Sequence, residues 1–192
     1  MSTSYYSKDE LQELGLGSFG ENVLISRFAR IYKPESIDIG NNVRIDDFCI
    51  ISGGSGIRIG SYIHIAPHVS LYGEAGIILE DFSGISSRSV LYTATDDYSG
   101  RSLTNPMVPI EFKPRYVANP IVLRKHSIVG TNSTILPGVE LGEGAAVGAH
   151  SLITKSCEPW SIFFGAPAKR IKARSKNLLE LEAQFKATLN EQ

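Results

Sequence analysis

Two adjacent acids, Asp96 and Asp97, are the residues of this chain whose type and setting most suggest chemistry. They lie in residues 92–120, a segment that carries several aromatic side chains and no histidine. A carboxylate can bind an incoming ammonium group and accept its proton, and an aromatic ring can stack on a base or a sugar. Adjacent Asp residues are also common in polar loops, so a structural or substrate-orienting role stays open for both.

A second cluster is basic and lies near the C-terminus, where Lys155 precedes a stretch with Lys169, Arg170 and Lys172. Cations of this kind bind phosphate groups. Small residues that would let a ligand approach the backbone closely come just before it: Gly144, Ala145, Ala146 and Gly148. The alternative is a solvated basic tail, with small residues that tight corners alone require.

The four histidines do not have the spacing of a metal site. His68 and His150 share a column of the repeat described below, but at least three coils separate them. At ~4.8 Å per layer they are more than ~10 Å apart, whereas zinc ligands converge at about 2 Å from the ion. We therefore expect no metal. His64 and His68 point outward before the aromatic segment, so either is an alternative general base, with a plain surface role open for each.

A six-residue repeat must position all of these groups. From residue 123 to residue 154 a bulky aliphatic recurs every sixth residue, and a small or β-branched residue follows four positions later. The aliphatics are Leu123, Val129, Ile135, Leu141, Val147 and Ile153. A period of six fits neither a helix nor simple strand alternation. It is typical of a hexapeptide β-helix, in which three units make one triangular coil of about 18 residues.

The upstream half has the same pattern with a longer repeat. Phe19, Ile39, Ile59 and Leu79 recur every 20 residues, because two extra residues fall on the third side of each triangle. The segments that contain these insertions, KPES, GGSG and GEAG, are rich in residues that favour turns. The two halves together predict six coils. Residues 92–120 leave from the third side after the fourth coil and must project, so we expect them to contact a substrate or another subunit.

The repeat predicts three regions: an N-terminal helical cap (1–17), the β-helix (18–156) and a C-terminal tail (157–192). Ser7 and Glu10 have the spacing of a capping box, which predicts a short helix to about Leu14. Residues 174–192 have apolar positions at helical spacing and predict an amphipathic helix. This helix is expected to cap the final coil, to pack against a neighbouring subunit, or both.

Composition excludes several classes of protein. A net charge of −1 gives no reason to expect nucleic acid as a partner. The longest apolar runs are far shorter than a membrane span, and the N-terminus has no basic or apolar region typical of a signal peptide. Two cysteines do not make a disulfide framework, and Cys49 falls at an inward position. We therefore expect a cytoplasmic, reduced protein without membrane insertion.

The chain resembles the hexapeptide-repeat acyltransferases in three features. These are the hexads, the loop that interrupts them, and the sequence ITKS followed by GAPAKRIKAR. The family includes the galactoside, maltose and xenobiotic acetyltransferases. The texts YSKDEL, YTATDDYSG and TNP are similar to the enzymes that N-acetylate dTDP-4-amino-4,6-dideoxyglucose. The resemblance implies an all-β solenoid, a left-handed parallel β-helix. It also implies a homotrimer with its active sites between subunits and acetyl-CoA as the acyl donor.

The resemblance assigns residues to that chemistry. Family members place basic residues at the positions of Lys155, Lys169 and Lys172, after a Thr that is Thr154 here. The residues expected to bind CoA are Gly130, Ala145, Ala146, Gly148, Thr154, Lys155, Pro167, Lys169, Arg170 and Lys172. Those expected to contact the acceptor are Tyr92, Tyr98, Asn105 and His68. The candidates for catalysis are Asp96, Asp97 and His64.

One departure from the family bears on the reaction. Galactoside-type enzymes place a histidine on the long loop, at a position that corresponds to Asp96 here. A hydroxyl acceptor profits from a near-neutral base, whereas an amine needs only to lose a proton and be held against the thioester. We therefore expect acetyl transfer to the amine of a nucleotide-linked amino-deoxysugar, in cell-surface polysaccharide biosynthesis such as that of lipopolysaccharide. A sugar O-acetyltransferase of the galactoside or maltose type and a non-catalytic β-helix binding module remain alternatives.

Overall fold

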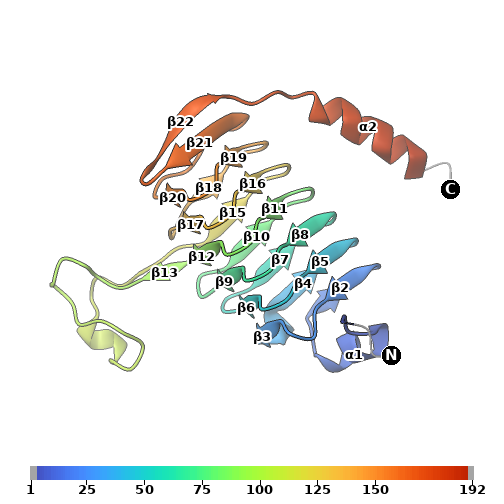
Figure 1. Cartoon of the computed structure of the whole chain (residues 1–192). Coiled ribbons are helices and arrows are strands. Elements are labelled where there is room, and N and C mark those ends of the chain that lie inside the picture. Colours follow the sequence, from blue (N-terminus) through green and yellow to red (C-terminus); the bar gives the residue numbers. More distant parts are fainter. Residues whose placement is uncertain (1–3, 190–192) are drawn as a thin grey trace.

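The computed structural model describes residues 4–189, which form a parallel β-solenoid with one long arm and a C-terminal helix (Figure 1). The ends of two predicted regions, residues 1–3 and 190–192, lie outside the described residues. The chain winds through three flat sheets, and each turn of the winding contributes one short strand to each sheet. The predicted solenoid is therefore confirmed.

As far as residue 153, the strands of the solenoid alternate among the three sheets in regular rotation. The first sheet contains β1 (Ser18–Phe19), β4 (Ile37–Ile39), β7 (Ile57–Ile59), β10 (Ile77–Leu79), β15 (Ile121–Leu123) and β18 (Glu140–Leu141). The second contains β2 (Val23–Ile25), β5 (Val43–Ile45), β8 (Ile63–Ile65), β11 (Gly84–Ile85), β16 (Ile128–Val129), β19 (Ala146–Val147), β21 (Ser161–Gly165) and β22 (Ala168–Ala173). The third contains β3 (Arg30–Tyr32), β6 (Ile50–Ser52), β9 (Ser70–Tyr72), β12 (Val90–Tyr92), β17 (Thr134–Ile135) and β20 (Leu152–Ile153).

The register follows the repeat that the sequence shows. Ile39 pairs with Ile59 and Ile59 with Leu79, so identical positions of successive coils lie directly above one another. The inward aliphatics form stacked columns that are almost completely buried, and Ile45, Ile65 and Leu91 have no exposed surface. Burial of these columns is the main stabilising contribution, because each coil covers the apolar face of the next.

The C-terminal end of the solenoid contains more structure than the repeat predicts. Cys157 forms a bridge with Leu141, and β21 then pairs in parallel with β19, so a partial seventh turn follows the six coils. β22 folds back antiparallel on β21 and completes a hairpin that covers the last coil (Figure 1). We call β21, β22 and their turn the basic hairpin. The hairpin covers this end of the solenoid, whereas the sequence analysis expected the helix within residues 174–192 to cap the final coil, to pack against a neighbouring subunit, or both.

The two helices lie at opposite ends of the chain and have different tasks. α1 (Lys8–Glu13) begins with the predicted capping box between Ser7 and Glu10, and its Leu11 is buried against the first coil. α2 (Leu178–Leu189) lies along the corner between the first and second sheets, where Phe185 contacts Tyr62 and Phe82 edge to face. None of the described helices is long and apolar enough to cross a membrane.

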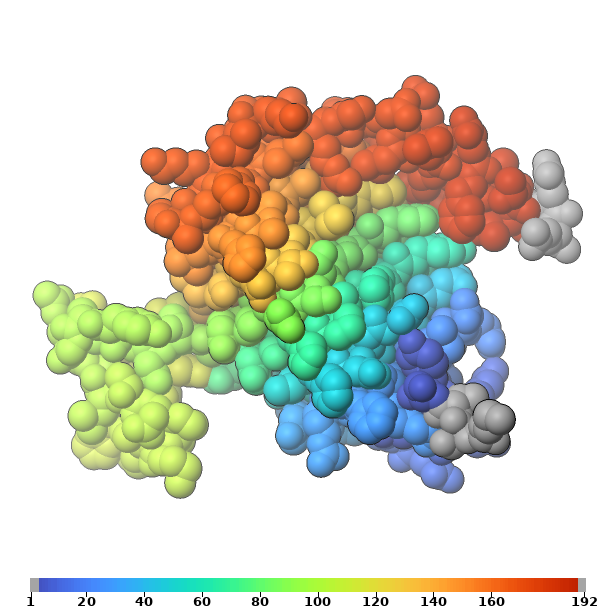
Figure 2. All heavy atoms as spheres, viewed as in Figure 1, coloured from blue at the N-terminus to red at the C-terminus, as the bar shows by residue number. Residues whose placement is uncertain are grey.

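The arm, residues 93–120, leaves the coil after Tyr92 and returns at Ile121. Its stem is an antiparallel pair, β13 (Ala94–Thr95) with β14 (Val117–Ala118), and a short 3₁₀ turn, η2 (Ile110–Phe112), lies near its tip. A second such turn, η1 (Pro34–Ser36), fills one of the third-side insertions. In Figure 2 the arm stands away from the body of the molecule, as the length of the insertion predicts.

Candidate active site

Asp96 is held by the arm itself. Its carboxylate accepts a hydrogen bond from the backbone N–H of Asn105 at 2.8 Å and pairs with the ammonium group of Lys113 at 3.0 Å. Lys113 is only 7% exposed and also lies over the ring of Tyr116. The hydrogen bond from Asn105 and the pairing with Lys113 lower the pKa of Asp96. Asp96 is therefore ionised at neutral pH and holds the two sides of the arm together.

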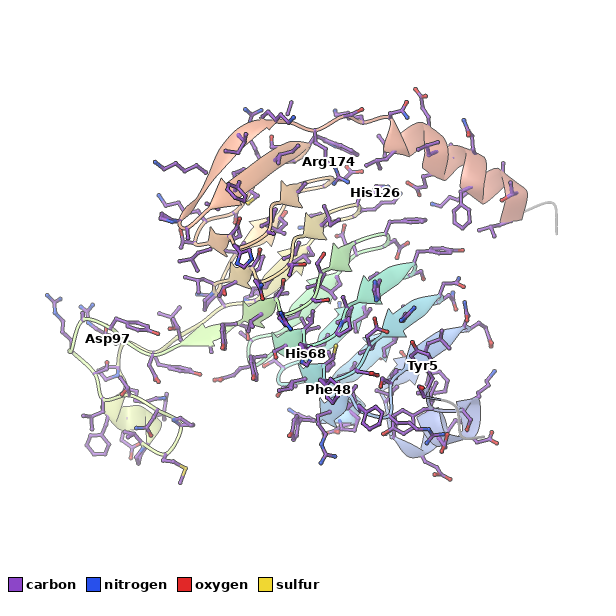
Figure 3. All side chains as sticks on the ribbon, in the orientation of Figure 1. Tyr5, Phe48, His68, Asp97, His126 and Arg174 are labelled. Carbon is purple, nitrogen blue, oxygen red and sulfur yellow. The ribbon has the colours of Figure 1, made fainter. Side chains whose placement is uncertain are left out.

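Asp97 closes a turn one residue later. It accepts hydrogen bonds from the hydroxyl of Ser99 at 2.8 Å and from the backbone N–H of Arg101 at 2.8 Å. Burial works to raise the pKa of Asp97, but these hydrogen bonds outweigh it and the pKa is lowered. Figure 3 shows Asp97 far out on the arm, away from the coils. Both acids thus have local partners that their spacing in the sequence did not reveal.

A hollow of about 980 Å³ lies between the arm and the third sheet. Tyr92 and Tyr98 line it, together with Asp96. Tyr92 stacks on Tyr72 of the preceding coil with ring centroids 5.2 Å apart, whereas Tyr98 is 96% exposed. Asn105 is not among the residues that line this hollow, and its side-chain oxygen accepts a hydrogen bond from Met107. The structure therefore brings Tyr92, Tyr98 and Asp96 together, and Asn105 shapes the turn behind them.

A second polar cluster surrounds His64 on the outer face of the second sheet. The Nε2 atom of His64 lies 2.7 Å from Oδ2 of Asp46, and Arg44 donates to the other carboxylate oxygen at 2.6 Å. Burial works to raise the pKa of Asp46, but the hydrogen bonds from His64 and Arg44 outweigh it and the pKa is lowered. The imidazole of His64 is half exposed and oriented by a carboxylate, the arrangement that a general base requires.

The other histidines have different surroundings. His126 is buried, stacks on Phe82 and pairs with Glu182 of α2 at 2.7 Å, so it holds the helix against the solenoid. His68 and His150 lie at the corner between the second and third sheets, and His68 stacks on Phe48 at 5.0 Å. The described residues contain no group of three or more side chains able to hold a metal ion.

Of the residues expected to bind CoA, Thr154 and Lys155 follow β20 at the far edge of the third sheet, whereas Gly130 and Gly148 follow β16 and β19 at the corner of His68 and His150. We call the latter the second corner and define it by one residue per coil: Phe28, Phe48, His68, Arg88, Asn132 and His150. The end of β21 reaches it too, because the N–H of Gly165 donates to the hydroxyl of Ser151 beside His150. The basic hairpin therefore stands directly above this column, with Pro167 in its turn and Lys169 and Lys172 exposed on β22.

The basic side chains of the hairpin and of Lys155 before it differ in whether they form ion pairs. Arg170 pairs with Glu158 and with the hydroxyl of Ser161. In the part of the chain that the structure describes, the ammonium groups of Lys155, Lys169 and Lys172 form no ion pair. These three exposed lysines are available for phosphate groups, and Thr154 precedes the first of them.

The small residues of the fifth and sixth coils turn out to be packed by the chain itself. A Cβ atom on Gly130 would meet the backbone N of Ala149 at 2.6 Å, and one on Gly148 would meet the ring of Phe164 at 2.5 Å. Ala145 is fully buried, and both of its backbone groups are bonded within the solenoid. These three positions are small because the coils stack closely. Ala146 lies on the outer face of β19 and is partly exposed.

Sequence reasoning missed a set of donors at the second corner. The backbone N–H groups of Ser87, Thr131 and Ala149 have no hydrogen-bond partner among residues 4–189. They occupy equivalent positions of the fourth, fifth and sixth coils, directly before Arg88, Asn132 and His150. Stacked donors of this kind suit the amide oxygens of a pantetheine chain or the oxyanion of a tetrahedral intermediate. Only the coil geometry reveals them, because any residue type provides an N–H group.

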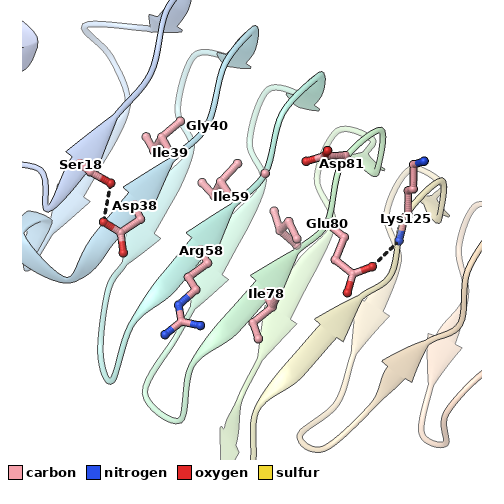
Figure 4. Close-up of a pocket in the computed structure, with 12 residues that line it drawn as sticks. Ser18, Asp38, Ile39, Gly40, Arg58, Ile59, Ile78, Glu80, Asp81 and Lys125 are labelled. Carbon is pink, nitrogen blue, oxygen red and sulfur yellow. Dashed lines mark hydrogen bonds between the residues drawn. The ribbon is translucent and has the colours of Figure 1, made fainter. Parts of the chain in front are cut away.

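A further hollow of about 560 Å³ lies on the first sheet, on a different face from the arm (Figure 4). Arg58 points out of the sheet between Asp38 and Ile78, and Glu80 accepts a hydrogen bond from the backbone of Lys125. None of the residues predicted to act in catalysis or binding lines it.

The arm and the second corner occupy different edges of the third sheet. Within the described chain Asp96 pairs with Lys113, and no ion pair or hydrogen bond joins it to the basic hairpin. The structure thus contains two candidate half-sites: the acidic, aromatic arm, and the second corner with its free N–H donors and the exposed lysines of the basic hairpin. One chain does not bring them into contact.

Comparison with known proteins shows to which protein family this chain belongs. No model of a known protein family matches the chain. The dTDP-4-amino-4,6-dideoxy-D-glucose acyltransferase of Escherichia coli is 46% identical over 184 residues, 95% of both chains. A chloramphenicol acetyltransferase of Klebsiella aerogenes is 42% identical, but only over 59 residues, 28% of each chain. Of these two relatives, the amino-sugar enzyme is similar over nearly the full length of the chain.

Solved structures similar to this chain point to the same family. AntD, an N-acyltransferase from Bacillus cereus in complex with dTDP and 3-hydroxybutyryl-CoA, is 48% identical with a TM-score of 0.95, over 98% of this chain and 100% of that chain. A serine variant of AntD in complex with dTDP-4-amino-4,6-dideoxyglucose and coenzyme A has a TM-score of 0.94. A hexapeptide-repeat acetyltransferase from Vibrio cholerae, 20% identical with a TM-score of 0.58, shares the fold alone. With 46–48% identity over nearly its full length, the chain belongs to the dTDP-4-amino-4,6-dideoxy-D-glucose acyltransferase family of left-handed β-helix enzymes.

Proposed function

We propose that this protein transfers an acetyl group from acetyl-CoA to the amine of a nucleotide-linked amino-deoxysugar, dTDP-4-amino-4,6-dideoxyglucose. The observation that carries the proposal is the near-complete match to AntD, solved with that sugar nucleotide and with coenzyme A. The absence of histidine from the arm agrees with an amine rather than a hydroxyl acceptor.

Acyl-CoA fits the second corner and the basic hairpin. Lys155, Lys169 and Lys172 offer unpaired cations to its phosphates. The free N–H groups of Ser87, Thr131 and Ala149 continue in the direction of the coils and suit the amides of the pantetheine arm. This path places the thioester near the fourth and fifth coils, at the end of the stacked donors.

The transfer is a direct displacement through a tetrahedral intermediate. The uncharged amine attacks the thioester carbonyl and forms the new C–N bond, while the carbonyl oxygen becomes an oxyanion. Backbone N–H donors at the second corner, such as that of Ser87 or Thr131, stabilise this charge. The C–S bond then breaks, and the thiolate of CoA takes up a proton equivalent to the one that the nitrogen loses. The products are the amide and free CoA.

Four side chains are proposed to assist the nitrogen. Asp96 and Asp97 attract the ammonium form of the acceptor, and the Asp46–His64 pair offers an oriented base for its proton. In AntD a serine and an aspartate ten residues further on have each been replaced in solved variants. The pairs Ser86–Asp96 and Ser87–Asp97 have this spacing here. The local pairing of Asp96 with Lys113 supports a positioning role for that carboxylate.

The complete site needs a second copy of the chain. The arm exposes Tyr98 and Met107 at 96% and 90%, and Ile110 at 63%, which suits burial against another subunit. An arm that reaches the second corner of a neighbour would join the two half-sites that one chain keeps apart. We therefore propose a homotrimer with three sites between subunits. Light scattering that gives the mass of a monomer at working concentration contradicts this arrangement.

The cellular setting is part of the same proposal. Both cysteines are buried and unpaired, and burial raises the pKa of Cys49 to about 11 and of Cys157 to about 12. Unreactive free thiols agree with a reducing compartment. We place the enzyme in the cytoplasm, where it would supply an acylated sugar nucleotide to the synthesis of lipopolysaccharide or another cell-surface polysaccharide.

Release of free CoA thiol tests the reaction. Purified protein is given acetyl-CoA with dTDP-4-amino-4,6-dideoxyglucose, with its 4-hydroxy counterpart, or with a simple galactoside. We expect turnover of the amine alone. Turnover of the galactoside with silence on the amine establishes the O-acetyltransferase instead. A thermal-shift titration with CoA covers the non-catalytic alternative, because a ligand that binds only the native state raises the melting temperature. 3-Hydroxybutyryl-CoA in place of acetyl-CoA tests the acyl group.

A further inference from the structure

A hydrogen bond joins the arm to the body of the solenoid at a point beyond the base of the arm. The hydroxyl of Tyr116, directly before β14, donates to Oε2 of Glu74 at 2.5 Å. Glu74 lies in the insertion between β9 and β10, 42 residues away in the sequence. Burial and the carboxylate of Glu74 raise the pKa of Tyr116 above its ordinary value. The hydroxyl therefore keeps its proton at neutral pH and remains a donor to a charged acceptor, which is one of the stronger kinds of hydrogen bond.

Other contacts between the arm and the coils lie at the base of the arm. Thr93 donates to the carbonyl of Tyr72 through both its N–H and its hydroxyl. Among the described residues, the bond from Tyr116 to Glu74 is the single hydrogen bond between residues 94–118 and the coils, and no ion pair joins them. The stem has only two residues in each strand, so this bond limits how far the arm can turn about its base.

The ring of Tyr116 extends this constraint to the carboxylate of Asp96. The ammonium group of Lys113 lies 4.3 Å from the centre of the Tyr116 ring and 3.0 Å from Oδ1 of Asp96. The ring attracts the cation, and Lys113 is buried, so its side chain has few other positions. A continuous series of contacts thus leads from the solenoid into the arm through Glu74, Tyr116, Lys113 and Asp96. All four residues line the hollow between the arm and the third sheet.

The solenoid itself does not need an acid at position 74. The 20-residue repeat places Pro34 and Gly54 at the equivalent positions of the two preceding insertions. The backbone carbonyl of Glu74 accepts hydrogen bonds from Ser55, a contact that any residue at this place could make. Its carboxylate, in contrast, contacts the arm through Tyr116. The side chain of Glu74 therefore acts on the arm and not on the stacking of the coils.

We propose that Glu74 and Tyr116 are positioning residues for the acyl transfer: their hydrogen bond sets the angle of the arm and, through Lys113, the place of Asp96. This inference rests on the proposed function and adds to it a pair of residues that do not have to touch the acceptor. One of the two lies outside the arm, so the coils take part in placing the acidic half-site.

Steady-state kinetics of three variants test the pair. Tyr116→Phe removes the hydroxyl and keeps the ring beside Lys113, Glu74→Ala removes the acceptor, and Glu74→Gln keeps an acceptor oxygen without the charge. We expect Tyr116→Phe and Glu74→Ala each to lower kcat for the amino sugar about tenfold, because a displaced arm misplaces the acceptor. Glu74→Gln should retain most of the activity. The double variant Tyr116→Phe/Glu74→Ala should be no slower than the single variants, since both remove the same interaction.

Two further variants serve as matched controls. Tyr32 is an exposed tyrosine of the third sheet, and Glu35 is an exposed acid in an earlier insertion. Tyr32→Phe and Glu35→Ala should turn over the amino sugar as wild type does. The KM for acetyl-CoA and the melting temperature should not change in any of the five variants, because neither the basic hairpin nor the buried columns are altered.

The outcomes separate this inference from the proposed function. If wild-type protein acylates the amino sugar and both Tyr116→Phe and Glu74→Ala keep its kcat, the inference alone fails. It also fails if Glu74→Gln is as slow as Glu74→Ala while Tyr116→Phe is normal, since the carboxylate then acts on the substrate itself. Dissociation of the oligomer in Tyr116→Phe, measured by light scattering, overturns it too, because the hydroxyl then serves a subunit contact. If wild-type protein acylates no dTDP-amino sugar, the proposed function fails and the inference with it.

Discussion

Asp96 and Lys113 lie 17 residues apart in the sequence and 3.0 Å apart in the arm, and Lys113 is almost completely buried. The pair determines how the arm folds, because Asp96 also holds the backbone of Asn105 and Lys113 the carbonyl of the same residue. Removal of either partner leaves the other without its counter-charge in a partly buried place. The arm therefore presents its aromatic side chains only while this pair is intact.

A double-mutant cycle on this pair separates positioning from catalysis. Asp96→Asn and Lys113→Met should each lower kcat/KM for the amino sugar by about 10²-fold, because a displaced arm misplaces the acceptor. The double variant should be no slower than the single variants, since both remove the same interaction. If Asp96→Asn abolishes turnover while Lys113→Met retains it, Asp96 acts directly on the substrate. Steady-state kinetics and the KM for acetyl-CoA, which should not change, decide between these outcomes.

The Asp46–His64 pair should affect the chemical step. His64→Gln is expected to lower kcat by at least about 10²-fold and to change its pH profile, because an oriented imidazole is lost. Asp46→Asn should lower kcat less, since the base remains but its orientation is lost. Arg44→Gln is the control, because it removes a neighbouring charge and leaves the pair in place. Wild-type kcat in His64→Gln across the pH range would show that the pair is structural.

The basic hairpin should control the affinity for acyl-CoA. Lys169→Ala and Lys172→Ala are each expected to raise the KM for acetyl-CoA about tenfold, with kcat nearly unchanged, because phosphate contacts are lost equally in ground and transition states. The KM of the wild type should rise with ionic strength, and that of the double variant should rise less. Lys8→Ala, an exposed lysine at the other end of the chain, serves as the control. Equal KM values in all variants would remove the hairpin from the CoA site.

Complementation tests whether the site lies between copies. Asp96→Asn lies in the arm and the double variant Lys169→Ala/Lys172→Ala in the hairpin, so in the proposed trimer, at acetyl-CoA concentrations far below its KM, each variant loses activity through a different half of every site. Mixed trimers prepared by co-expression should regain a fraction of wild-type activity, because some sites combine two intact halves. Trimers assembled separately and then mixed without subunit exchange should not. No recovery in co-expressed mixtures, confirmed to be mixed by mass spectrometry, would show that each chain has its own complete site.

Glu182 should anchor α2 in a pH-dependent way. Burial works to raise its pKa, but hydrogen bonds from Lys125, Lys186 and His126 outweigh it and lower the pKa to about 2. Because the folded pKa lies below the ordinary value of 4.5, this contribution is complete above about pH 4.5 and is lost as pH falls toward 2.

Melting curves of Glu182→Gln and Glu180→Gln check this prediction. Glu182→Gln should melt several degrees below wild type at pH 7, at about 2–4 °C for each kcal/mol lost, and the difference should shrink as pH falls below 4. Glu180→Gln, an exposed position on the same helix, should melt as wild type does. A difference between Glu182→Gln and wild type that stays constant from pH 7 to pH 3 would contradict the electrostatic origin.

The sequence by itself determined the solenoid, because the six-residue pattern is local and each unit carries its own inward and outward positions. It also located the arm, since 29 residues without the repeat cannot be absorbed by a coil. The capping box of α1 was readable for the same reason, as its two partners are three residues apart. The sequence also indicated the basic tail and the acid pair as candidate functional residues, but it did not reveal the residues with which they pair.

Only the tertiary structure decided which groups meet across coils. Asp96 pairs with Lys113, and His64 pairs with Asp46, but no fixed spacing in the sequence predicts these contacts. The packing of α2, which lies near the C-terminus, on the corner between the first and second sheets is likewise visible only in the structure. The seventh turn and its hairpin follow from the edge that β19 offers, although the repeat has ended there. Free donors and exposed rings at the second corner exist because stacking aligns residues 18, 20 or 44 positions apart, a relation that a linear pattern does not contain.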